Sequence, residues 1–160
     1  MLPREPFDLQ RFVDAQDAVF PAIRAELRAG RKESHWMWFI FPQLRGLGQS
    51  STARFFGISS LEEAAAYLQH PVLGPRLREC TELINAIENR PASQIFGYPD
   101  DMKFRSSMTL FAATVEGGGI FDQALRKYFA GEPDSLTVDL LRSQIDSNGQ
   151  FRKTPRSAAP

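Results

Sequence analysis

Apolar residues recur every three or four positions along most of the chain, which is the spacing of one face of an α-helix. The first such stripe runs from Phe12 to Leu27, with Asp8 placed to cap its start and Gly30 to end it. Pro21 lies inside the stripe and has no amide hydrogen to donate to the preceding turn. The pattern therefore predicts one kinked helix or two shorter ones over this stretch.

Two serines and a proline mark the next clear helix. Ser59 and Ser60 each precede a glutamate by three positions, which is the capping-box pattern in either register. The His70-Pro71 pair ends this helix, because a residue before proline is pushed out of helical geometry. Periodicity predicts the remaining helices at about 72–88, 102–115, 121–129 and 136–141, with a short turn at 92–96.

The chain shows no internal repeat and no apolar-polar alternation suited to a large sheet. We therefore expect an all-α fold, a compact single domain of about six to eight unequal helices that do not form a bundle, over residues 1–146. From residue 147 the composition turns to Gly, Gln, Arg, Lys, Ser and Pro, which predicts a disordered tail over 147–160.

Charge and cysteine content limit the partners and the compartment. The chain has 160 residues with 19 basic and 19 acidic side chains, so no broad field attracts nucleic acid or an anionic membrane. Cys80 is the only cysteine, which fits a reducing compartment. Residues 1–10 lack the apolar core of a signal peptide, and the longest apolar run, Trp36 to Pro42, is far below the ~20 residues that span a bilayer. We expect a cytoplasmic protein without a nucleic-acid or membrane partner.

Both tryptophans lie in one short segment together with cations, a histidine and an amide. Large flat rings beside cations suit a pocket for a planar, anionic small molecule, because rings stack and cations neutralise phosphate or carboxylate. The alternative is that these rings pack in the core, as most of the 13 phenylalanines must. His35 is either a general acid or base, or a histidine bonded to backbone. The predicted ligand-binding residues of this segment are Lys32, Trp36, Trp38, Gln43 and Arg45.

A second candidate segment lies at the start of a later helix. Lys103 precedes Ser106 and Ser107 by three and four positions, so the ammonium and at least one hydroxyl share a helix face. A phosphate or carboxylate would fit there, with Asp101 as a proton carrier. Alternatively, Asp100 or Asp101 caps the helix and the serines bond to their own turn. Two histidines and one cysteine without a close carboxylate pattern predict no metal site, and nothing indicates a cofactor.

The chain resembles a bacterial family of unknown function, often labelled calpastatin-like, in the stretches SHWMWFIFPQLRGLG at 34–48, HPVLGPRL at 70–77 and DDMKFRSSMTLF at 100–111. The resemblance covers roughly residues 7–141 and implies a small helical intracellular protein without an established reaction. Calpastatin-type inhibitors are long, disordered repeat chains, whereas this chain is short, aromatic and globular in pattern. A fainter similarity in size and residue mixture is to small bacterial glycosidases that act on ADP-ribose-type nucleotides, and it carries over no catalytic position.

The candidate residues support three interpretations. In the first, both segments form one cleft that binds a nucleotide-like or ADP-ribose-like anion. This interpretation leaves open whether the protein also hydrolyses the ligand, with His35 or Asp101 moving a proton. In the second, the aromatic residues form a protein-binding surface with a rim of cations. In the third, all of these residues are core and the chain is an assembly subunit; a homodimer is compatible with each interpretation.

Overall fold

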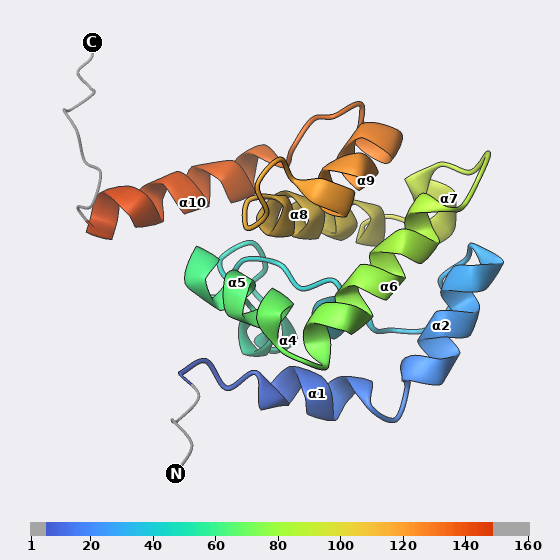
Figure 1. Cartoon of the computed structure of the whole chain (residues 1–160), viewed down its shortest axis with the longest axis horizontal. Coiled ribbons are helices and arrows are strands. Elements are labelled where there is room, and N and C mark those ends of the chain that lie inside the picture. Colours follow the sequence, from blue (N-terminus) through green and yellow to red (C-terminus); the bar gives the residue numbers. More distant parts are fainter. Residues whose placement is uncertain (1–5, 149–160) are drawn as a thin grey trace.

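The chain folds into helices of unequal length joined by loops. The computed structural model describes residues 6–148, with side chains described up to residue 145. Within this part there are ten helices and, in place of a strand, one isolated parallel bridge. The helices are α1 (Gln10–Gln16), α2 (Phe20–Ala29), α3 (Met37–Ile40), α4 (Ser51–Phe55), α5 (Leu61–Gln69), α6 (Leu73–Asn85), α7 (Ala92–Phe96), α8 (Asp100–Ala112), α9 (Gly119–Phe129) and α10 (Ser135–Asn148) (Figure 1).

This arrangement confirms the predicted all-α, non-bundle single domain. The helices number ten, more than the expected six to eight, because the first apolar stripe forms two helices and because a short helix, α4, forms where none was expected. The short turn expected at 92–96 is α7.

The boundaries of α1 and α2 follow from backbone chemistry. Pro21 occupies the first turn of α2, where a missing amide hydrogen costs nothing, so the proline splits the stripe into two helices. Gly30 ends α2 in the left-handed conformation, with φ 74°. The expected Asp8 cap is wrong: α1 begins after Leu9, and Asp8 contributes its backbone carbonyl to the Arg11 amide at 3.3 Å.

The predicted capping box is present at α5. The Ser60 hydroxyl accepts the Glu63 amide at 3.1 Å, and the Glu63 carboxylate accepts the backbone and hydroxyl hydrogens of Ser59 at 2.8 and 2.7 Å. Ser60 is therefore the cap, and Ser59 is tied to the same glutamate. His70 leaves helical geometry with ψ 135°, as expected for a residue before proline.

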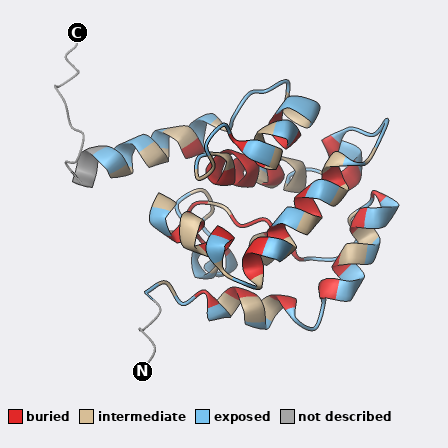
Figure 2. Ribbon diagram, in the orientation of Figure 1, coloured by how far each residue is buried: buried red, intermediate tan, exposed pale blue. Residues whose placement is uncertain are grey.

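Helix α8 forms the centre of the core and packs against α3, α5, α7, α9 and α10. Figure 2 shows α8 largely buried and α10 largely exposed or intermediate. The Phe104 ring, on α8, lies 5.0 Å from the ring of Phe41 and 4.7 Å from the ring of Phe96, measured between centroids. These ring pairs fix the segment after α3 and helix α7 against one end of α8.

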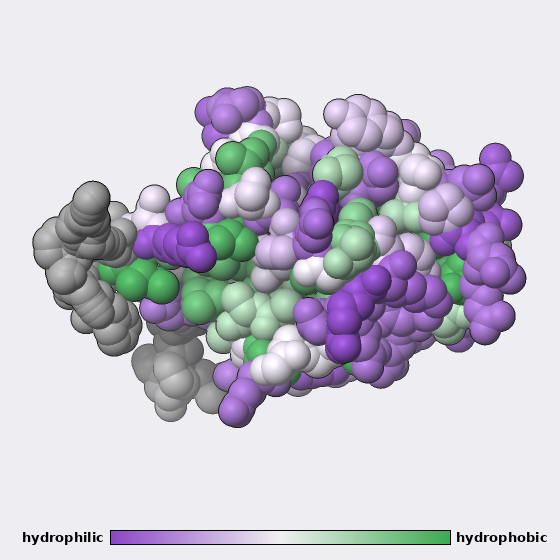
Figure 3. Space-filling model, turned by 90° about the horizontal axis from the view of Figure 1, so that it is seen from above, coloured by the Kyte–Doolittle hydropathy of each residue, from purple (hydrophilic) through white to green (hydrophobic). Residues whose placement is uncertain are grey.

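Helix α10 extends from the rest of the fold and leaves apolar side chains exposed. Leu136 is 62% exposed and Ile145 is 42% exposed. Figure 3 shows hydrophobic residues among hydrophilic ones on the side of that face where α10 lies. The Gln144 side chain donates to the Ser59 carbonyl at 2.8 Å, which ties α10 to the loop before α5.

The last helix ends later than expected. Helix α10 continues to Asn148, so the first two residues of the predicted tail are helical, and residues 149–160 lie outside the described residues. Among the helices that are described, none combines the length and apolar character needed to cross a bilayer.

Candidate functional site

A surface cleft of about 180 Å³ lies where the start of α8, the loop after α3 and the start of α10 meet. Residues from both candidate sequence segments line it, so the two segments contribute to one site. Gly48 belongs to the wall, and a Cβ there would lie 2.7 Å from the Cβ of Ala53, so a larger residue would force the loop apart. The lining residues are Trp38, Gln43, Leu47, Gly48, Pro99, Met102, Lys103, Ser106, Asp134 and Leu136.

Lys103 and Trp38 form the most distinctive pair in the cleft. The Lys103 ammonium lies 3.9 Å from the centroid of the half-buried Trp38 ring, which is a cation–π contact. A carboxylate oxygen of Asp100 lies 3.4 Å from the same ammonium, and the other oxygen lies 2.9 Å from the ammonium of Lys32. Two ammonium groups therefore share one carboxylate, and the three groups together carry one net positive charge.

Trp36 and Lys32 belong to the fold rather than to the cleft surface. Trp36 is 2% exposed, and its indole N–H donates to the Glu26 carboxylate at 2.8 Å. The Lys32 ammonium lies 5.2 Å from the centroid of the Trp36 ring, and the Lys32 side chain is 7% exposed. The core alternative therefore holds for Trp36, and Lys32 acts on the cleft through Asp100.

The Glu26 carboxylate organises the loop that carries these residues. It accepts the backbone amides of Glu33 and Ser34 at 2.8 and 3.1 Å, and the Ser34 hydroxyl at 2.5 Å. Burial by itself raises the pKa of Glu26, but the hydrogen bonds from Ser34, Glu33 and Trp36 outweigh it and lower the pKa to about 2. The loop before α3 is thus fixed to α2 by an ionised carboxylate.

Gln43 and Ser106 add polar groups to the cleft wall. The backbone carbonyl of Gln43 accepts the Ile58 amide at 2.9 Å, which fixes its position, while its side-chain amide makes no hydrogen bond to any described residue. The Ser106 hydroxyl donates to the Met102 carbonyl one turn earlier at 3.2 Å, and its oxygen can still accept. Ser107 is fully buried, and its hydroxyl lacks a partner within the described part of the chain.

Three further predicted residues do not line the cleft. His35 is exposed, and its ring makes no hydrogen bond to the residues that the structure describes. Arg45 is exposed and donates to the Gly57 carbonyl at 3.1 Å. Asp101 lies in the first turn of α8 and accepts the amide of the next residue, Met102, at 2.9 Å.

Asp134 is a charged cleft residue that sequence reasoning missed. One of its carboxylate oxygens, Oδ2, accepts the backbone amide of Thr137 at 3.0 Å and the Thr137 hydroxyl at 2.7 Å, so it caps α10. Its own amide donates to the Thr109 hydroxyl of α8 at 2.8 Å. An aspartate three residues before a threonine at a helix start is a recognisable cap, but its place beside α8 is a tertiary feature.

Comparison with known proteins identifies the family. Residues 6–141 match the family described as "Protein of unknown function (DUF1810)". The chain belongs to the DUF1810 family. A solved structure titled "conserved hypothetical protein Rv1873 from Mycobacterium tuberculosis" is similar to this DUF1810 chain, with 58% sequence identity and a TM-score of 0.85 over 86% of this chain and 99% of that one. None of the curated proteins matches the chain.

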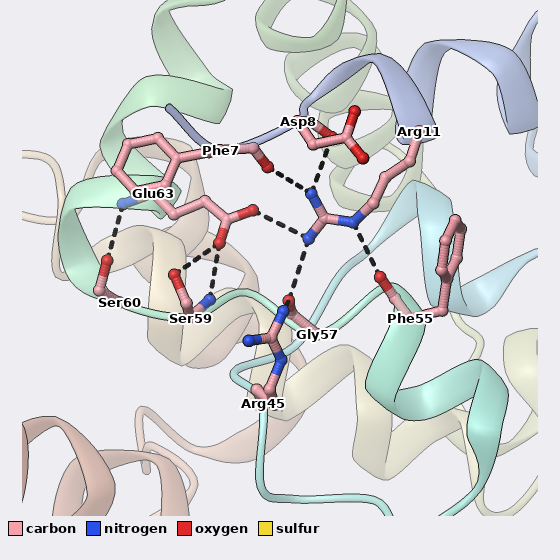
Figure 4. A network of polar contacts seen from close by, with 9 residues as sticks. All are labelled: Phe7, Asp8, Arg11, Arg45, Phe55, Gly57, Ser59, Ser60 and Glu63. Carbon is pink, nitrogen blue, oxygen red and sulfur yellow. Dashed lines mark hydrogen bonds and ion pairs between the residues drawn. The ribbon is translucent and has the colours of Figure 1, made fainter. Parts of the chain in front are cut away.

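A second groove on this DUF1810 protein, about 430 Å³, lies between α1 and α4, and the Arg11 guanidinium is part of its wall. Figure 4 shows that this guanidinium is already saturated by the protein itself. Its side chain is 7% exposed, and it pairs with Glu63 at 2.9 Å. It also donates, at 2.7 to 3.1 Å, to the carbonyls of Phe7, Asp8, Phe55 and Gly57. Arg11 therefore holds the fold together and offers no free cation to a ligand.

The first cleft is chemically the better site on the DUF1810 protein. It presents one ammonium group over an indole ring, one unbonded amide and one carboxylate oxygen that the helix cap does not use. Such a set binds a small polar molecule through several different contacts. The residues that the structure describes contain no group of three metal-ligating side chains, so the described chain offers no assembled metal site.

Proposed function

We propose that this protein binds a small anionic molecule with a flat ring, of the nucleotide or ADP-ribose class, in the cleft beside Trp38. The observation that carries the proposal is the Lys103 ammonium 3.9 Å from the Trp38 ring centroid within that cleft. An anionic group bound by Lys103 would lie next to the Trp38 ring, which can contact a flat group of the same ligand. Gln43 and Ser106 would add hydrogen bonds to the same ligand.

The charge of the groups at the cleft and the cleft volume further limit which ligands fit. Lys32 and Lys103 share Asp100, so the net charge of this group is one positive unit, which complements one anionic group. The volume of about 180 Å³ is below the ~300–1,000 Å³ of pockets that enclose a drug-sized ligand. We therefore expect the cleft to enclose one end of a nucleotide and to leave the other end in solvent.

The proposal is one of binding, with hydrolysis as an extension that needs its own support. His35 and Asp101, the proton carriers expected from the sequence, do not line the cleft. A turnover measurement on any ligand that binds decides whether a hydrolase or glycosidase activity exists.

Thermal melting tests the proposal with AMP, ADP, ADP-ribose and inorganic phosphate. A ligand that binds only the folded state at about 100 times its dissociation constant adds about 2.7 kcal/mol, or roughly 5–10 °C for a chain of this length. Lys103→Met keeps the apolar stem over Trp38 and removes the charge, so it should weaken binding about 10-fold to 100-fold. Lys127→Met is the matched control, because Lys127 also lies beside a ring, that of Tyr128, but on α9. A panel that leaves the melting temperature unchanged would overturn the proposal.

A protein-binding role is the second candidate, and exposed apolar side chains favour it. Met102 and Leu136 line the cleft and are 36% and 62% exposed, and Tyr98, which precedes the cleft residue Pro99, is 82% exposed. Aromatic and apolar residues surrounded by polar ones are typical of interface hot spots. Capture of a partner by the wild type but not by Leu136→Asp, with no small-molecule effect, would favour this role.

We also propose that the protein acts in the cytoplasm, without a nucleic-acid or membrane partner. The balance of 19 basic and 19 acidic residues and the single, buried Cys80 support this. The calpastatin-like label adds nothing to the proposal, because inhibitors of that type are extended repeat chains and the described residues pack around one core. Sedimentation of the purified chain decides whether it is the homodimer that the sequence leaves open.

A further inference from the structure

Asp134 brings a second charge of opposite sign into the cleft that contains Lys103. Its carboxylate has two oxygens, and the α10 cap uses only Oδ2, through the amide and hydroxyl of Thr137. The other oxygen, Oδ1, makes no hydrogen bond to a described residue. The cleft therefore contains a fixed acceptor with spare capacity as well as a donor cation.

We propose that Asp134 makes the cleft selective for anionic ligands that also carry hydroxyl groups, that is, sugar phosphates and ribonucleotides. This inference rests on the proposed function above and names the part of the ligand that Asp134 recognises. An ionised carboxylate only accepts hydrogen bonds, so the group that it binds must donate them. A phosphate cannot donate in its fully ionised form, and it is repelled by Asp134.

The opposite charges also set the direction of the ligand. Lys103 attracts the anionic group and Asp134 repels it, so the phosphate lies at the α8 side and the hydroxyl groups lie toward α10. A hydroxyl at Asp134 forms a charge-assisted bond, which is stronger than a bond between neutral groups. A ligand without hydroxyl groups would cover the carboxylate oxygen and displace water from it, and it would donate no hydrogen bond in place of the one from water.

Asp134 is held rigidly enough to make this selection. Its backbone amide is bonded to Thr109 on α8, and its side chain is bonded to Thr137 on α10. Thr109 and Lys103 lie on the same helix, so the acceptor and the cation are fixed to one rigid element. A preorganised pair of this kind discriminates between ligands without losing side-chain entropy on binding.

Calorimetric titration of AMP and of its 2′,3′-dideoxy analogue tests the inference, because the two share the base and the phosphate and differ in the sugar hydroxyls. The wild type should bind AMP about 10-fold to 100-fold more tightly than the dideoxy analogue. Asp134→Asn keeps a side-chain oxygen for the α10 cap, since asparagine caps helices as well as aspartate does. In this variant the ratio of the affinity for AMP to the affinity for the dideoxy analogue should fall toward one.

The control is Asp139→Asn, the same change at an exposed position of α10 outside the cleft, which should keep the wild-type preference. Melting temperatures without ligand confirm that both variants are folded. Equal, measurable affinity of the wild type for both nucleotides would overturn the inference and leave the proposed function standing. Absence of binding to either nucleotide, together with an unchanged melting temperature across the ligand panel, would overturn both.

Discussion

Replacement of Arg11 by methionine should be one of the most destabilising single changes in this protein. The Arg11 side chain is 7% exposed and joins α1 to the loop after α4 and to α5 (Figure 4). It donates to four backbone carbonyls in addition to the carboxylate of Glu63. Methionine fills similar space but donates nothing, so all of these acceptors lose a partner together.

The structure sets the size of this effect. Glu63 is 2% exposed, and removing one partner of a buried ion pair costs about 3–5 kcal/mol. Ser59 still donates to the other oxygen of Glu63, which keeps the cost within that range. At about 2–4 °C per kcal/mol for a chain of this size, the melting temperature should fall by roughly 6–20 °C. That loss is a large fraction of the ~5–15 kcal/mol stability of a typical domain.

Urea unfolding of the wild type, Arg11→Met and Arg45→Met measures the effect against a matched control. Arg45 donates to the same Gly57 carbonyl at 3.1 Å, but it is exposed and makes no other side-chain hydrogen bond to the described residues. Its loss should cost less than about 1 kcal/mol. Equal losses of unfolding free energy in the two variants would refute the argument from burial.

Two further predictions concern stability. Gly74→Ala places a Cβ 2.1 Å from the Leu68 carbonyl oxygen, so chemical denaturation should show a loss of at least about 1–3 kcal/mol, and an unchanged midpoint would contradict this contact. The folded-state pKa of Glu26 is about 2 against an ordinary 4.5, so its stabilisation is complete above pH 4.5 and is lost as the pH falls toward 2. Melting temperatures across this range should therefore fall more steeply for the wild type than for Glu26→Gln, and parallel curves would show that the carboxylate contributes nothing.

Sequence reasoning succeeded where the cause of a structure lies within a few residues of it. Pro21 splits the first stripe, Gly30 ends α2, and Ser60 caps α5, each through a bond or a dihedral angle of its own turn. Such local signals do not depend on the rest of the fold. They predicted the fold class and most helix boundaries, although the count of helices came out too low.

The contacts that sequence reasoning missed all join distant parts of the chain. Arg11 finds its acceptors on α4 and α5, at positions up to 52 residues away. Asp134 lies in the same cleft as Lys103 because its amide bonds to Thr109, 25 residues earlier. The sequence around Arg11 looks like that of an ordinary solvated charge, and the cap pattern at Asp134 says nothing of its place beside α8. Helix α4 was missed for a different reason, because its cap, Ser50, follows a glycine-rich segment whose composition predicts a loop.

The two tryptophans show why residue type alone does not separate a site from a core. Trp36 and Trp38 lie two positions apart, and both are predicted from the sequence to bind a ligand. The structure separates them because Glu26 accepts the Trp36 indole hydrogen and draws that ring into the core, while Trp38 stays at the cleft beside Lys103.

Asp100 then connects the two rings electrostatically. Its carboxylate binds Lys32, which lies next to Trp36, and Lys103, which lies next to Trp38. The ammonium on the core side and the ammonium at the cleft are therefore paired with the same carboxylate. An anion that enters the cleft competes with Asp100 for Lys103 alone, because Lys32 is covered and keeps its partner. Binding therefore requires no new buried charge: the ligand replaces a long, 3.4 Å contact, and the shorter 2.9 Å pair behind it remains.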